Sequence, residues 1–121
     1  MIDHIAIPVS DYEKSRTFYK SALAPLDYKL IMEHGISGGG FGCDNKPDFW
    51  IQESSNIAPI HIALSSKDRA TVDAFYKSAL EAGGIDNGEP GVRSEYHPTY
   101  YGAFIKDPDG HNIEAVCHIP E

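Results

Sequence analysis

The sequence predicts an α+β fold built from two copies of one βαβββ module. The hexapeptide FYKSAL at residues 18–23 recurs unchanged at residues 75–80, and the same offset of 57 residues superimposes residues 4–7 (HIAI) on residues 61–64 (HIAL). A repeat of this length that occurs only twice indicates a duplicated module rather than a solenoid array. We therefore expect a single domain over residues 1–121, built of two internal repeats at about 1–57 and 58–121.

The first copy shows the elements of the module in order. Residues 3–9 are typical of a strand, because isoleucine and valine alternate there with other residue types. Residues 10–13 (SDYE) form a capping-box pattern, which predicts a helix that ends before Pro25. The glycine-rich stretch 35–42 lacks the strand–glycine–helix order of a nucleotide-binding loop, so we interpret it as a flexible loop and the start of a strand. The remaining strands are expected at 28–32, 39–43 and 49–53.

The second copy repeats this order. A strand near residues 60–65 places its histidine, alanine and serine on one face, and a helix from about Lys67 carries a buried stripe at i, i+3, i+4 spacing. Gly83-Gly84 ends that helix. Asp107-Pro108-Asp109-Gly110 is a strong turn signal. Strands are expected near 87–90, at 101–106 and at 112–118, the last two joined by this turn as a hairpin.

Composition excludes several classes of partner. A formal net charge of −8 argues against nucleic acid and anionic membranes, which attract clustered Lys and Arg. No apolar run approaches the ~20 residues that span a bilayer, and the N-terminus has no signal-peptide pattern. Two cysteines, Cys43 and Cys117, do not form a disulfide framework. We expect a cytoplasmic protein with both thiols reduced and buried as small apolar side chains.

Three residues form a candidate metal site. His4 and His61 occupy equivalent strand positions in the two copies, and Glu114 lies in the last strand. Two neutral imidazoles and a carboxylate suit Fe, Mn, Ni, Co or Zn as a divalent ion and leave positions open for water or substrate. Each residue alone has a simpler explanation, as a hydrogen-bonded strand histidine or a satisfied buried carboxylate. The duplicated histidine favours a shared site, because packing does not require the same residue twice.

The same residues resemble a known superfamily. The motifs DHIA at residues 3–6, HIAL at 61–64 and DPDGHNIE at 107–114 are similar to those of the vicinal oxygen chelate superfamily. That group includes glyoxalase I, extradiol dioxygenases, fosfomycin-resistance thiol transferases and bleomycin-resistance proteins. The resemblance covers essentially the whole chain. It implies a cup-shaped mixed sheet with helices outside, a homodimer with sites near its interface, a small-molecule substrate, and a divalent metal held by His4, His61 and Glu114.

The chain departs from individual branches of that superfamily. Glyoxalases resemble it but use a fourth ligand, a glutamate in the last strand of the first module that also moves the proton. Superimposing Phe41 on Phe104 puts Ile51 opposite Glu114, and a slip of two residues would bring Glu53 there instead. The thiol transferases have a threonine two residues after the first histidine, where this chain has Ala6.

Polar and aromatic residues precede the second-last strand. Among them, Tyr100 or Tyr101 is a candidate hydrogen-bond donor to a substrate oxyanion, and His97 a candidate general base. Tyrosines at the start of a strand are also common packing residues, and His97-Pro98 also indicates a turn. The candidate substrate-binding residues are Phe49, Trp50, Arg93 and Tyr96.

Three functions stay open. The first is a divalent-metal-dependent enzyme of the glyoxalase-like type, a lyase or related enzyme acting on a small substrate that presents adjacent oxygens. The second is a metal-free protein of the bleomycin-resistance type that sequesters an aromatic or cationic ligand, which the acidic charge and the aromatic residues suit. The third is an Fe(II) dioxygenase of the extradiol kind.

Overall fold

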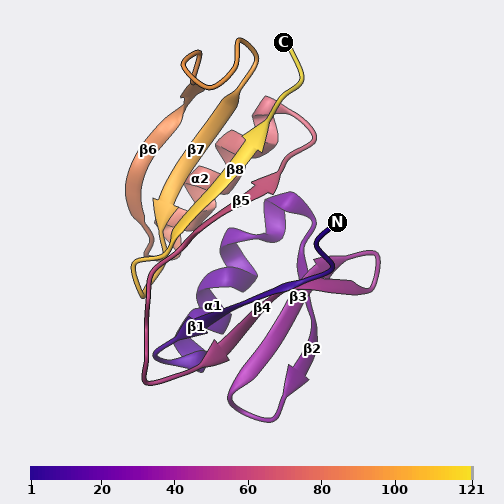
Figure 1. Ribbon diagram of the computed structural model, residues 1–121, viewed down its shortest axis with the longest axis vertical. Coiled ribbons are helices and arrows are strands. Elements are labelled where there is room, and N and C mark those ends of the chain that lie inside the picture. The colour runs from indigo at the N-terminus through magenta and orange to yellow at the C-terminus, as the bar shows by residue number, and fades with distance from the viewer. Residues whose placement is uncertain (121) are drawn as a thin grey trace.

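The computed structural model describes residues 1–120 and contains two similar halves (Figure 1). The first half runs through β1 (Ile5–Val9), α1 (Tyr12–Ala22), a short 3-10 helix η1 (Ala24–Leu26), β2 (Lys29–His34), β3 (Gly38–Cys43) and β4 (Lys46–Glu53). The second half runs through β5 (His61–Ser65), α2 (Arg69–Glu81), β6 (Ile85–Val92), β7 (Tyr101–Lys106) and β8 (Asn112–Cys117). The predicted α+β fold of two βαβββ modules is confirmed.

Each module forms its own open four-stranded mixed sheet, with strand orders β1-β4-β3-β2 and β5-β8-β7-β6. The first strand of each module runs parallel to the last, and the other pairs are antiparallel. Each helix covers one face of its sheet (Figure 1). We call the other face the open face. On this face Ala6 of β1, His61 and Ala63 of β5, and His4, which directly precedes β1, are exposed.

Aspartates cap both helices. The carboxylate of Asp11 accepts the backbone N–H of Lys14 at 3.1 Å, and that of Asp68 accepts the N–H of Thr71 at 2.8 Å. The N-cap of α1 is therefore Asp11, one residue later than the sequence predicted, and with Lys14 at N3 the capping box does not form. Ser10 does not cap α1, and its backbone N–H instead donates to Asp109 of the second module at 3.1 Å.

One hydrophobic core joins the two modules. It contains the inward side chains of α1 and α2, which pack together, and the buried faces of both sheets. Tyr19, on α1, is fully buried, with its ring centroid 5.1 Å from that of Phe49 and 5.0 Å from that of Phe18. Cys117 is buried as expected, at 1% exposure. The expectation for Cys43 is wrong, because it ends β3 beside the Asp44–Asn45 turn and is exposed.

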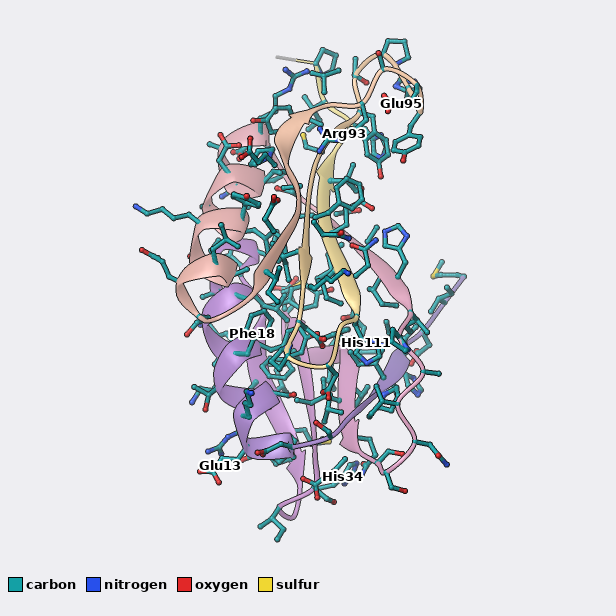
Figure 2. All side chains as sticks on the ribbon, turned by 90° about the vertical axis from the view of Figure 1, so that its left-hand side faces the viewer. Glu13, Phe18, His34, Arg93, Glu95 and His111 are labelled. Atoms are coloured by element: carbon teal, nitrogen blue, oxygen red, sulfur yellow. The ribbon has the colours of Figure 1, made fainter. Side chains whose placement is uncertain are left out.

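A network of hydrogen bonds connects the two modules at the turn of residues 107–110, which joins β7 to β8 as predicted. Tyr19 donates its hydroxyl to Asp107 at 2.5 Å, and the other oxygen of Asp107 accepts the N–H groups of Asp109 and His111. His111 is fully buried; its Nδ1 accepts the N–H of Ile60 at 3.0 Å and its Nε2 lies 2.7 Å from the carbonyl oxygen of Pro8. In Figure 2 this histidine lies at the level where the modules meet.

No helix among the described residues is long and apolar enough to cross a membrane.

Candidate functional site

The open face of the second sheet brings His61 and Glu114 together. Glu114 pairs with Ala63 of β5 on one side and Phe104 of β7 on the other, which places its carboxylate in the middle of the sheet. Its side chain has 0% exposure, and its Oε1 lies 2.7 Å from Nε2 of His61, which is half exposed. A buried carboxylate thus meets an imidazole nitrogen that solvent and ligands can reach.

Tyr100 forms a hydrogen bond with the second oxygen of the Glu114 carboxylate. Its hydroxyl donates to Oε2 of Glu114. Gly102 permits this approach, because a Cβ there would lie 3.1 Å from the Tyr100 ring and 3.2 Å from Oε2 of Glu114. Burial, followed by the hydrogen bond to Glu114, raises the pKa of Tyr100 above its ordinary value of 10.0. The phenol therefore stays protonated and remains a hydrogen-bond donor at neutral pH.

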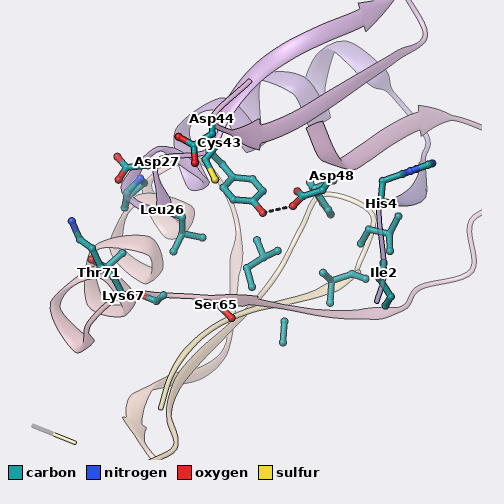
Figure 3. A pocket seen from close by; sticks show the side chains of 18 of the residues that line it. Ile2, His4, Leu26, Asp27, Cys43, Asp44, Asp48, Ser65, Lys67 and Thr71 are labelled. Atoms are coloured by element: carbon teal, nitrogen blue, oxygen red, sulfur yellow. Dashed lines mark hydrogen bonds between the residues drawn. The ribbon is translucent and has the colours of Figure 1, made fainter. Parts of the chain in front are cut away.

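His4 does not join this pair within the chain. It lies at the start of the first sheet, with its side chain 57% exposed and its Nδ1 2.7 Å from Asp3. Within residues 1–120 no group of three His, Cys, Asp or Glu side chains is placed to hold a metal ion. Both histidines border a cavity of about 910 Å³ between the modules. Figure 3 shows His4 at one end of that cavity and the hydrogen bond from Tyr28 to Asp48 on its wall.

The residues present in one chain fit part of a divalent-metal site. Adjacent ligands of one metal ion lie roughly 3 Å apart when metal–ligand bonds are about 2.1 Å, and the His61 nitrogen and Glu114 oxygen are already 2.7 Å apart. A buried carboxylate with a hydrogen-bonded second oxygen is also typical of a metal ligand supported by its neighbours. One chain thus supplies two of the three predicted ligands in a suitable arrangement.

The strand register corrects the predicted counterpart of Glu114 in the first module. In the second sheet Ala63 pairs with Glu114, and in the first sheet the equivalent Ala6 pairs with Trp50. Ile51 points into the core, at 0% exposure. Glu53 accepts the backbone N–H of Tyr12 at the start of α1, at 2.9 Å. Neither Ile51 nor Glu53 therefore stands where Glu114 stands, and the equivalent position carries an indole instead of a carboxylate.

Three other predicted residues, Tyr96, His97 and Arg93, lie around Tyr100 and Glu114 together with His118. The ring of Tyr96 lies 5.1 Å from that of Tyr100, and the ring of His97 lies 6.2 Å from that of His118, which itself lies 5.2 Å from Tyr100. Arg93 stacks over Phe104 at 5.4 Å and donates to the carbonyl of Glu89. The loop that precedes β7 thus forms one wall beside the His61–Glu114 pair.

Two predicted residues face away from that wall. Tyr101 lies on the helix side of its strand, where its hydroxyl donates to Asp73 of α2 at 2.6 Å and Arg69 stacks on its ring. Phe49 has 1% exposure and packs in the core, with only its margin on the cavity between the modules. Packing accounts for both residues.

Sequence reasoning missed Phe104 and His34. The Phe104 ring lies 6.0 Å from that of His61, and its pairing with Glu114 would have followed from the alternation of β7. The imidazole of His34 stacks on Trp50, with ring centroids 5.2 Å apart and planes 18° apart. No local signal in the sequence pairs these two residues, which lie on β2 and β4.

The fold and this site define a class of protein: paired βαβββ modules that carry histidine and glutamate on their open faces. The chain belongs to the Glyoxalase/Bleomycin resistance protein/Dioxygenase superfamily, whose family model matches residues 1–115. A search among curated proteins gives no significant match.

Solved structures show the same fold. A glyoxalase/bleomycin resistance protein from Albidiferax ferrireducens T118 is 24% identical, with a TM-score of 0.84 over 95% of this chain and 97% of that one. A glyoxalase/bleomycin resistance protein/dioxygenase family enzyme from Burkholderia phytofirmans PsJN is 15% identical, with a TM-score of 0.76 and 98% of each chain covered. A lactoylglutathione lyase from Agrobacterium tumefaciens is 14% identical, with a TM-score of 0.73 over 97% of this chain and 92% of that one. At these identities the likeness establishes the fold alone.

Proposed function

We propose that this protein is a divalent-metal-dependent enzyme of the glyoxalase-like type, a lyase or related enzyme whose small substrate presents adjacent oxygens. The observation that carries the proposal is the His61–Glu114 pair. Its carboxylate has 0% exposure and its imidazole nitrogen lies 2.7 Å away on an open sheet face. Burying a carboxylate is costly unless it is paired or bound to a metal, so this position is more than a surface ion pair.

We propose further that the site is completed in a homodimer. His4 occupies the position equivalent to His61, yet one chain keeps the two histidines on separate sheets. A twofold arrangement that faces the first sheet of one copy toward the second sheet of another would add His4 to the His61–Glu114 pair, twice per dimer. This arrangement uses all three predicted ligands and sets the two open faces opposite each other, with the site between them.

Bound there, the divalent ion would act as a Lewis acid toward the substrate oxygens. The chain itself would supply the polar surroundings. The phenol of Tyr100 holds the Glu114 carboxylate in place from its second oxygen. His97 lies in the adjacent loop, where the backbone N–H of Thr99 donates to its Nδ1 at 3.2 Å. The neutral ring therefore carries its hydrogen on Nε2, which could donate it to substrate as a general acid rather than act as the predicted base. Burial keeps Tyr100 neutral, so its role is donation rather than base catalysis.

A second candidate function is sequestration of a small ligand without chemistry. The cavity between the modules favours it, since Asp27, Asp44 and Asp48 border that cavity together with the ring of Tyr28 (Figure 3). Carboxylates and an aromatic ring together suit a cationic ligand. Dioxygenase chemistry would require Fe(II) in the His61–Glu114 site and consumption of oxygen.

Metal content and subunit mixing test both parts of the proposal. Elemental analysis after chelation and reconstitution should give about one transition metal ion per chain. His61→Ala and Glu114→Ala should each lose it, whereas His34→Ala, a matched histidine outside the triad, should retain it. No metal in the parent protein after reconstitution would overturn the enzyme proposal in favour of sequestration. Oxygen uptake with the iron form would identify the dioxygenase.

A mixture of two variants then tests the shared site. His4→Ala and Glu114→Ala chains, unfolded and refolded together, should form about half heterodimers, each with one intact site, and recover about one metal per four chains. Each variant refolded alone should bind none. A mixture that binds no metal, from a parent that binds one per chain, would show that His4 of a second copy does not complete the site.

The expected location of this protein is the cytoplasm, where Cys43 and Cys117 would remain reduced thiols.

A further inference from the structure

The glycine-rich stretch of the first module is an ordered strand whose glycines are required by close contacts. Gly38 and Gly40, in β3, face the open side of the sheet. A Cβ on Gly38 would lie 2.5 Å from the side-chain oxygen of Gln52, and one on Gly40 would lie 2.8 Å from the indole of Trp50. Residues 35–37 form a turn, and the strand expected at 39–43 begins one residue earlier, at Gly38. Because these glycines have no side chains, this part of β3 leaves open space on the open face.

The open space above these glycines lets the rings of Trp50 and His34, from different strands, stack on each other. Trp50 lies on β4 and His34 on β2, with β3 between them. Since Gly40 pairs directly with Trp50 and Gly38 with His34, no side chain stands between the rings. Their centroids are 5.2 Å apart and their planes differ by 18°. Figure 2 shows His34 at the end of the molecule that the first module forms.

The stacked rings line a pocket of about 510 Å³ on this face. The charged groups at its margin are Lys46 and Asp3, whose Nζ and Oδ2 lie 3.3 Å apart, so they largely neutralise each other. His4 and Ala6 border the other side. A pocket that offers an indole and an imidazole, without excess charge, suits an uncharged planar ring better than an ion or an aliphatic chain.

We propose that this pocket is an aromatic-binding subsite, in which an uncharged planar aromatic ring stacks against the Trp50–His34 pair. In the register of the repeat, Trp50 stands where the second module carries Glu114. The first module therefore carries a stacking surface at the position where the second carries a carboxylate. The proposal rests on the proposed function only in stating that this molecule would bind beside the metal. Stacking itself requires no metal.

The chain contains a single tryptophan, so the subsite can be observed directly. Chelator-treated, metal-free protein would be titrated with benzamide and, as a matched probe of similar size that is not planar, with cyclohexanecarboxamide. The single indole N–H resonance of the ¹H–¹⁵N spectrum should shift saturably with benzamide, whose affinity should exceed that of cyclohexanecarboxamide by about 5-fold.

Variants locate the binding. Trp50→Leu should lose most of the preference for benzamide, measured by saturation-transfer NMR of the ligand, whereas Trp50→Phe should retain part of it. Gly40→Ala should weaken binding without removing any ring, because the added Cβ displaces the indole. Ile36→Ala, at a 92% exposed side chain of the same module, is the control that should bind as the parent does.

Equal affinity for the two amides, or an indole resonance that responds to neither, would overturn the proposal. Metal content, measured on the same variants, separates this outcome from failure of the proposed function. Trp50→Leu should keep its metal, and loss of metal from Glu114→Ala should leave benzamide binding unchanged.

Discussion

Replacement of His111 by alanine should destabilise the protein strongly, although this residue lies outside the candidate metal site. The imidazole has 0% exposure and connects three segments: its own turn, the linker before β5 and the first strand. The N–H of Ile60 donates to Nδ1, so the other nitrogen carries the hydrogen and donates to the carbonyl of Pro8. Alanine removes both bonds and leaves a cavity where the ring was.

The magnitude follows from these contacts. Each lost hydrogen bond costs about 1 kcal/mol, and the two backbone groups lose their partners in a partly buried position. Removing most of a fully buried side chain adds about 1 kcal/mol or more for the cavity. We expect His111→Ala to lower the free energy of unfolding by about 3 kcal/mol, equivalent to a decrease in Tm of roughly 12 °C for a chain of this size.

Urea denaturation would measure this loss, with two variants that each retain one bond. In His111→Asn the amide oxygen can still accept the N–H of Ile60, and in His111→Gln the amide nitrogen can still reach the carbonyl of Pro8, so each should lose about half as much. His118→Ala, an exposed histidine on β8's extension, should change stability by less than about 0.5 kcal/mol. A loss of less than about 1 kcal/mol in the free energy of unfolding for His111→Ala would refute the conclusion that this residue connects the modules.

Three further outcomes follow from the structure. Tyr19→Phe should cost about 2 kcal/mol in a urea titration, because Asp107 then keeps a buried carboxylate oxygen without its donor; a change under 0.5 kcal/mol would contradict this. Stability should fall as pH rises above 10.0, because the pKa of Tyr100 is raised in the folded state and unfolded chains ionise first; denaturation at neutral pH and at roughly pH 11 would check the direction, and Tyr100→Phe should lessen the decrease. A thiol reagent should label Cys43 rapidly and Cys117 only on unfolding, and a Cys43→Ser variant that still reacts fast would disprove this assignment.

The sequence could predict the fold because the repeat provided two views of the same module. The periodicity of α2 is clear, and through the repeat it supported the prediction of a helix in the first copy, which ends sooner because of Pro25. β6 was expected only near residues 87–90 but extends over Ile85–Val92. Gly88 has a φ of +149° and the pairing with β7 shifts twice along this strand, so its side chains do not show the strict alternation on which strand prediction depends.

The candidate site was predictable where it depends on motif and not where it depends on register. His61 and Glu114 came from conspicuous polar residues in apolar strands, and the structure does place them together. The counterpart of Glu114 was displaced by one residue, because phenylalanine at 41 and at 104 invites superposition although Phe41 is fully buried and Phe104 faces the open side. A phenylalanine suits either face of a sheet, so the shared letter does not fix the register.

The two modules differ most where their open faces would meet a ligand. The positions equivalent to Phe104 and Glu114 carry Gly40 and Trp50 in the first module, while the histidine at the start of each sheet is the same. If each face worked alone, the first would have a histidine and a stacking ring without a carboxylate, and the second a histidine and a carboxylate without a large ring surface. The faces are complementary only when they oppose each other, and one chain keeps them on separate sheets. The mixture of His4→Ala and Glu114→Ala chains therefore tests more than a ligand set. Recovery of metal in that mixture would place Trp50 of one copy beside Glu114 of the other, and aromatic binding and metal binding would then belong to one site.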